Sequence, residues 1–218
     1  MKFRRKSATE GQGSGADEGV ATPGVTEPVP PGPYDADELP EDGLERVDLG
    51  SLLIAPEEGR ELRLQVDETT GAVQSVMLAG ADGAIELRAF AAPRNGDLWT
   101  EVRPQIAADT AQRGGTANER EGRFGTELMC ELKVQRPEGG AVTQPSRIVG
   151  VNGSRWLLRA TFLGRPAIEP DKAEEWEDVL TRIAVRRGAH PLPVGDPLPL
   201  VLPDQARRIN PPVNPPVS

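Results

Sequence analysis

The stretch from Ile148 to Leu163 constrains the fold more than any other part of the chain. It reads IVGVNGSRWLLRATFL, in which two runs of β-favouring residues flank Asn152 and Gly153. Asn-Gly is typical of a two-residue hairpin turn, because both residues tolerate the positive φ that a type I′ turn requires. The sequence therefore predicts a β-hairpin in which Val149 lies opposite Trp156.

Both faces of this hairpin carry apolar side chains. Alternation along the second strand places Trp156, Leu158 and Phe162 on one face, and Leu157 and Leu163 on the other. An edge hairpin of an antiparallel sheet usually has one polar face. The hairpin is therefore predicted to lie at the centre of an antiparallel sheet.

Alternating apolar and polar residues predict further strands on both sides of the hairpin. These strands are expected at residues 51–56, 61–67, 73–79, 85–91, 116–123 and 128–134. A helical pattern begins at Leu98, with Asp97 as its N-cap, and continues to Gln112 with a kink expected at Pro104. A second helix is predicted after Pro170, with an apolar stripe at helical spacing. The stripe consists of Ala173, Trp176, Val179, Leu180 and Ile183.

Together these elements predict a single α+β domain over residues 51–188, with an antiparallel sheet and two helices packed on one face. Residues 1–33 are predicted to be a disordered tail, residues 34–50 an acidic arm, and residues 189–218 a proline-rich extended tail. Two helices cover only one face of a sheet well. We therefore expect the arm and the leucines of the 198–202 segment to cover the other face.

Composition limits the compartment and the class of partner. The chain has 218 residues, a formal net charge of −9 and a single cysteine, Cys130, so an intramolecular disulfide is excluded. Cys130 lies on the apolar face of its predicted strand, which favours a structural role. The sequence has no apolar run long enough to cross a membrane. These features predict a cytoplasmic protein that does not span a membrane.

Most catalytic equipment is missing from the sequence. The only histidine, His190, lies in the proline-rich tail, and neither a phosphate-binding loop nor a nucleophile elbow is present. The sequence therefore predicts no catalytic, cofactor-binding or metal-binding residue. Carboxylates are plentiful, so a hydrolase that uses only Asp and Glu remains an alternative.

The polar side of the predicted sheet offers a candidate interaction surface. It consists of Arg88, Phe90, Arg155 and Arg159. Arginines beside an aromatic ring can bind an anionic or planar partner, although arginine stems also commonly cover apolar surface. This surface and the missing catalytic machinery predict a non-enzymatic binding or adaptor module that acts on another protein.

Nucleic-acid association is the other alternative, and it would make the protein an accessory factor. That hypothesis depends on the basic N-terminus and on Arg147, Arg155, Arg159 and Arg165. The net charge of −9 disfavours it, because proteins that bind the phosphate backbone are usually basic.

Four segments carry a resemblance to a known family. They are residues 32–52, 89–94, 98–103 and 153–164. The sequence resembles an actinobacterial family of unknown function, the domain of unknown function 3710, over roughly residues 32–203. The resemblance implies a soluble protein and transfers no catalytic residue. The order of elements also loosely resembles PsbP-like folds, which are mostly binding modules.

Overall fold

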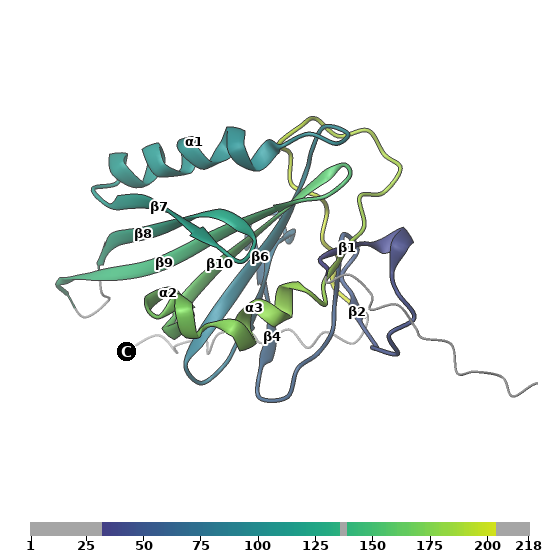
Figure 1. Ribbon diagram of the computed structural model, residues 1–218, viewed down its shortest axis with the longest axis horizontal. Coiled ribbons are helices and arrows are strands. Elements are labelled where there is room, and N and C mark those ends of the chain that lie inside the picture. Colours follow the sequence, from purple (N-terminus) through teal and green to yellow (C-terminus); the bar gives the residue numbers. More distant parts are fainter. Residues whose placement is uncertain (1–31, 136–138, 204–218) are drawn as a thin grey trace, which may run out of the picture.

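The computed structural model of the protein describes residues 32–135 and 139–203 (Figure 1). The disorder predicted for residues 1–31 and the extended conformation predicted for residues 204–218 lie outside the described residues. The described residues form two sheets and three α-helices.

A seven-stranded antiparallel sheet forms the body of the protein. Its strands follow the order β4-β5-β6-β10-β9-β8-β7, so the predicted hairpin β9–β10 is central. Their bounds are β4 (Glu61–Val66), β5 (Val73–Ala79), β6 (Gly83–Ala91), β7 (Thr116–Gly122), β8 (Gly125–Gln135), β9 (Ala141–Asn152) and β10 (Trp156–Gly164). The predicted strands are therefore confirmed.

The other elements are shorter. A small sheet of order β1-β11-β3-β2 consists of β1 (Tyr34–Asp35), β2 (Val47–Asp48), β3 (Leu52–Ile54) and β11 (Ala184–Val185). The α-helices are α1 (Leu98–Gln112), α2 (Arg165–Ile168) and α3 (Glu174–Leu180), and short 3-10 turns occupy Ala36–Glu38 and Pro170–Lys172. Helix α1 has the predicted bounds and continues through Pro104.

The register predicted for the central hairpin is wrong. Val149 lies opposite Ala160 instead of Trp156, and the turn falls on Ser154 and Arg155. No positive φ occurs at the Asn-Gly pair. Because the register differs by an even number of residues, each side chain keeps its predicted face.

A tertiary contact accounts for the change of register. The side chain of Asn152 is bound to the start of α1, where Nδ2 donates to Asp97 Oδ1 at 2.7 Å. Its Oδ1 accepts the backbone N–H of Trp99 at 3.2 Å. These bonds hold Asn152 at the end of a strand, so it is not available for the turn.

The two predicted helices lie on opposite faces of the large sheet, which corrects the prediction that they share one face. On the first face, Trp176 of α3 packs in the core that contains Phe162. On the second face, Trp99 of α1 packs in a separate core that contains Leu157. Trp99 approaches β9 closely because Gly150 has no side chain where the indole ring lies.

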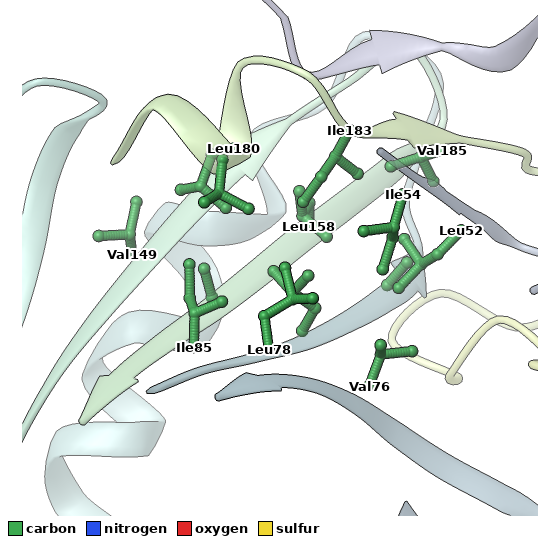
Figure 2. Close-up of a cluster of buried hydrophobic side chains, with 14 of the residues drawn as sticks. Leu52, Ile54, Val76, Leu78, Ile85, Val149, Leu158, Leu180, Ile183 and Val185 are labelled. Atoms are coloured by element: carbon green, nitrogen blue, oxygen red, sulfur yellow. The ribbon is translucent and has the colours of Figure 1, made fainter. Parts of the chain in front are cut away.

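The first face carries the larger core (Figure 2). Side chains from β3, β5, β6, β9, β10 and the α3–β11 segment meet there. The labelled members are Leu52, Ile54, Val76, Leu78, Ile85, Val149, Leu158, Leu180, Ile183 and Val185. Each is 2% exposed or less. Full burial of one such side chain contributes about 1.5–3 kcal/mol, so this core is a principal source of stability.

The second predicted helix is shorter than its apolar stripe. The stripe is buried as expected, but α3 ends at Leu180 and the chain then forms β11. Arg182 and Arg186 lie beyond the end of this helix. They form ion pairs with Glu57 and Asp48 at 2.7 and 2.8 Å.

The segment Gly195–Leu200, here called the strap, extends the sheet where β5 leaves β6. Strand β5 pairs with β6 only as far as Leu87. Beyond that point the N–H of Leu198 donates to the carbonyl of Ala89 at 2.8 Å. Leu198 is 3% exposed and belongs to the core of the first face. The prediction that this segment covers the second face is therefore wrong, because α1 has that position.

The acidic arm is also attached to the first face. Asp35 accepts the indole N–H of Trp156 at 2.7 Å and the hydroxyl of Ser154 at 2.8 Å. Leu49 is fully buried in the same core. The arm and the strap thus close one side of the sheet together.

Candidate interaction surface

Helix α1 covers only part of the second face. It packs on β7, β8 and β9 (Figure 1). Among residues 32–135 and 139–203, no helix packs over the neighbouring part of this face on β6 and β10. We call this part the open half, and it consists of the half-buried residues Glu86, Arg88, Phe90, Arg159 and Thr161.

The open half has a pair of arginines at its centre. Arg159 of β10 lies directly opposite Arg88 of β6 in the antiparallel ladder. Side chains opposite one another in such a ladder have Cβ atoms about 4.5–5.5 Å apart, and like charges at that spacing repel. The local sequence places each arginine on this face, because both alternate with buried apolar neighbours, and the register between β6 and β10 brings the two opposite one another.

Each guanidinium of the pair has a fixed contact. The Arg159 guanidinium lies over the ring of Phe90, with 5.0 Å between Cζ and the ring centroid. Arg88 Nε donates to the backbone carbonyl of Gln74 at 3.0 Å. These contacts orient the two side chains and leave the Nη groups of both without a protein partner in the described part of the chain.

The pair stands out because its two arginines lie opposite one another and neither has a carboxylate partner in the described part of the chain. Four other arginines of the described ranges, Arg94, Arg113, Arg155 and Arg187, also lack a carboxylate partner. Most arginines in the described ranges have a carboxylate oxygen within 4.0 Å, as Arg103 does with Glu119 at 2.7 Å. Neither Arg88 nor Arg159 has one in those ranges.

Electrostatics at Arg159 agree with this geometry. Burial, and after it the positive charge of Arg88, lower the pKa of the Arg159 guanidinium. The negative charge of Glu86 acts in the opposite direction. An anion between the two guanidinium groups would act against both causes of the lowered pKa, because a nearby opposite charge favours the charged guanidinium.

The structure brings together three of the four predicted surface residues. Arg155 lies apart from the others, in the exposed turn between β9 and β10. It is four residues from Arg159, which is about 13 Å along a strand. Its backbone carbonyl accepts the N–H of Ala92 at 3.0 Å, so the turn is tied to the end of β6.

A buried charge cluster on the first face was missed by the sequence analysis. Arg147 Nη2 donates to Glu127 Oε2 at 2.7 Å and to Glu177 Oε1 at 2.5 Å. Arg147 and Glu127 are 1% and 0% exposed. Cζ of Arg147 lies 5.0 Å from the centroid of the Phe162 ring, so the guanidinium also stacks on an aromatic face. The cluster joins α3 to β8 and β9.

The pKa of Arg147 reflects these partners. Burial acts against the charged guanidinium, but the hydrogen bonds to Glu127 and Glu177 outweigh it and raise the pKa. Arg120 and Arg123 extend the cluster toward solvent, at 3.7 Å from Glu127 and 3.8 Å from Glu177. Glu127 and Arg147 come directly before the strand predicted at 128–134 and the hairpin predicted from Ile148, and two charged residues at such positions gave no sequence signal for this cluster.

The arginines chosen for nucleic-acid binding do not form one surface. Arg147 is buried on the first face, whereas Arg159 lies on the second. Arg165 is within 3.3 Å of Asp82 and 3.7 Å of Glu169. This set is therefore not available as a single basic patch.

Acid–base chemistry finds little support in the described residues. A groove of about 430 Å³ between α3 and the β5–β6 turn is lined by Glu57, Asp178 and Trp176 among others. Glu57 is bound to Arg60 and Arg182, and Asp178 to Arg123. A general acid usually requires a raised pKa, and carboxylates that are paired with arginines favour the ionised form instead.

The carboxyl groups whose pKa departs from its ordinary value have it lowered. These are Asp42, Asp48, Glu61, Asp67, Asp97 and Glu169. The pKa of the buried Cys130 thiol is raised by desolvation, which makes a nucleophilic thiolate unfavourable.

Residues 32–135 and 139–203 contain no group of three or more His, Cys, Asp or Glu side chains that could hold a metal ion. None of their helices is long and apolar enough to cross a membrane.

The family described as "Protein of unknown function (DUF3710)" matches residues 32–208. The chain belongs to this family. The matched range includes the strap and the acidic arm, so both are parts of the family domain. No curated protein matches the sequence.

Two solved structures show weak similarity. A crystal structure of a protein from Bacteroides thetaiotaomicron VPI-5482 has 12% identity and a TM-score of 0.37, and the match covers 65% of this chain and 47% of that one. The solution structure of cyanobacterial PsbP (CyanoP) from Synechocystis sp. PCC 6803 has 12% identity and a TM-score of 0.35, with 65% and 92% covered. Similarities this weak do not bear on the function of this chain.

Proposed function

We propose that the protein is a non-enzymatic binding module, located in the cytoplasm, that recognises an acidic segment of another protein through the open half of the second face. The observation that carries the proposal is the pair Arg88–Arg159. Two arginines stand opposite one another with no carboxylate partner in the described ranges, on a sheet surface that no helix covers.

Charge and shape support a protein partner. The ring of the half-buried Phe90 lies under the Arg159 guanidinium, and aromatic residues with arginines are typical anchors of protein interfaces. A net charge of −9 disfavours long polyanions, because the rest of the surface would repel them. A short acidic segment meets less of this repulsion, because it contacts only the surface around the arginines.

The experiment compares acidic and basic peptide libraries for binding to the full-length protein. Labelled degenerate peptides rich in Asp and Glu are expected to bind, and Lys- and Arg-rich peptides of the same length are not. Arg159→Glu should abolish binding of the acidic library, because it places a negative charge beside Arg88.

Arg94→Glu is the matched control. Arg94 is an exposed arginine that also lacks a carboxylate partner in the described ranges, and it lies outside the open half. The proposal is wrong if the acidic peptides fail to bind, or if both charge reversals weaken binding equally.

A further inference from the structure

We infer that Arg88 and Arg159 together bind one phosphorylated side chain, a phosphoserine or phosphothreonine within the acidic segment of the partner. This inference rests on the proposed function and specifies the chemical group at the centre of the open half.

The number of donors in the pair favours a phosphoryl group over a carboxylate. A guanidinium has five N–H donors in a planar fork, and one fork already satisfies a carboxylate through two parallel bonds. A phosphorylated side chain has three acceptor oxygens and a charge of about −1.5 to −2 at neutral pH. Two facing arginines match that charge, whereas a single carboxylate would leave one cation uncompensated.

The pair is also held ready for such a ligand. The Nε–H of Arg88 is bound to Gln74, which directs its Nη groups away from the backbone. The Phe90 ring supports the flat side of the Arg159 guanidinium and leaves its edge, which carries the N–H groups, free. Orienting groups before binding reduces the entropy lost when the ligand arrives.

The neighbours of the pair limit the ligand to one compact anion. Glu86 lies on the same face, two residues before Arg88 on β6 and opposite Thr161 of β10. A second phosphate at that end would meet the Glu86 carboxylate and be repelled.

The test uses three degenerate peptide libraries that differ only in the central residue, which is phosphoserine, glutamate or serine. Binding of each library to the full-length protein is measured by fluorescence anisotropy. The phosphoserine library is expected to bind at least about ten-fold more tightly than the glutamate library. Arg88→Gln or Arg159→Gln should remove this preference, whereas Arg113→Gln, at an exposed arginine directly after α1, should leave it unchanged.

Lysine variants distinguish charge from geometry. The double variant Arg88→Lys with Arg159→Lys keeps both charges and loses both planar forks. It is expected to bind the phosphoserine library about ten-fold more weakly than the wild type. Thermal unfolding of each variant establishes that the fold is retained.

The outcomes separate the two proposals. Equal binding of the glutamate and phosphoserine libraries, lost in both arginine variants, would overturn the phosphate inference and leave the proposed function intact. Binding of neither library would overturn both. A phosphoserine preference that survives Arg88→Gln and Arg159→Gln would place the phosphate site elsewhere and overturn the inference.

Discussion

An arginine on the first face of the large sheet and an arginine on the second face differ in burial and in their partners. On the first face, Arg147 is buried and held between Glu127 and Glu177. On the second face, Arg159 of the adjacent strand is half-buried and has no carboxylate partner among the described residues. A buried charge must be paired, because desolvation costs several kcal/mol, whereas a charge beside water can remain unpaired. The comparison therefore assigns Arg147 to the fold, and it agrees with the role in recognition that we propose for Arg159.

The closure of each face explains the difference. The small sheet, α3, the arm and the strap all pack on the first face, so water is excluded there. Of the helices in the described part of the chain, α1 is the one that packs on the second face, where it covers β7–β9 (Figure 1). The open half is the part of the second face, on β6 and β10, that α1 does not cover.

Breaking the first-face cluster is the largest perturbation we expect. Arg147→Met leaves two carboxylates buried near one another without their cation, and should lower the free energy of unfolding by about 3–5 kcal/mol. Urea denaturation measures the loss. Arg123→Met, at the partly exposed edge of the same cluster, should cost less than about 1 kcal/mol. Similar losses for the two variants would show that the cluster is not organised around Arg147.

Removing the strap's anchor is the next largest effect. Leu198→Ala leaves a cavity in the core of the first face and should cost about 2–5 kcal/mol. Val201→Ala is the control, because Val201 is 50% exposed and should change stability by less than about 0.5 kcal/mol. If Leu198→Ala is as mild as the control, the strap does not help to close this face.

Helix α1, which packs on the second face, is stabilised by its N-cap residue Asp97. Asp97 Oδ1 accepts the N–H of Thr100 at 3.0 Å, and Asp97→Ala should cost about 1 kcal/mol. Asp109→Ala, which removes an exposed acid from the last turns of the same helix, should not destabilise it.

The pH dependence of that cap has a definite sign. Hydrogen bonds from the side chain and backbone of Thr100 lower the pKa of Asp97 in the folded protein. Its stabilisation is therefore fully present above the unfolded pKa of about 3.9, and is lost as the pH falls through the lower folded value. In thermal unfolding, the difference between wild type and Asp97→Ala should shrink below about pH 4. A constant difference down to pH 2 would contradict this role.

The smallest effect on stability is expected in the open half itself. Arg159→Gln removes a repulsion with Arg88 and a stacking contact with Phe90, so the free energy of unfolding should change by less than about 0.5 kcal/mol. Chemical denaturation of Arg159→Gln and Arg147→Met under the same conditions compares the contribution of the two arginines to stability directly. A loss above about 2 kcal/mol would make Arg159 a structural residue.

Much of the fold could be predicted because alternation is a local signal. Ile85, Leu87 and Ala89 are buried as their spacing indicates, and Asp97 caps α1 as expected. Arg88, Phe90 and Arg159 were also placed on one face correctly, since the parity of each strand decides that. The buried pair Glu127–Arg147 escaped notice because a polar residue at an alternating position normally faces water.

The sequence by itself determined the strands of the large sheet, the bounds of α1 and which side chains share a face, because these follow from the period of the local pattern. Only the tertiary structure decided where the hairpin turns, which helix covers which face, and which arginines have partners. Each of these depends on contacts between distant segments, such as Asn152 with Asp97 or Arg147 with Glu177. The free energies of such contacts are absent from any local window, and here they override the turn preference of Asn-Gly and separate a structural arginine from an available one.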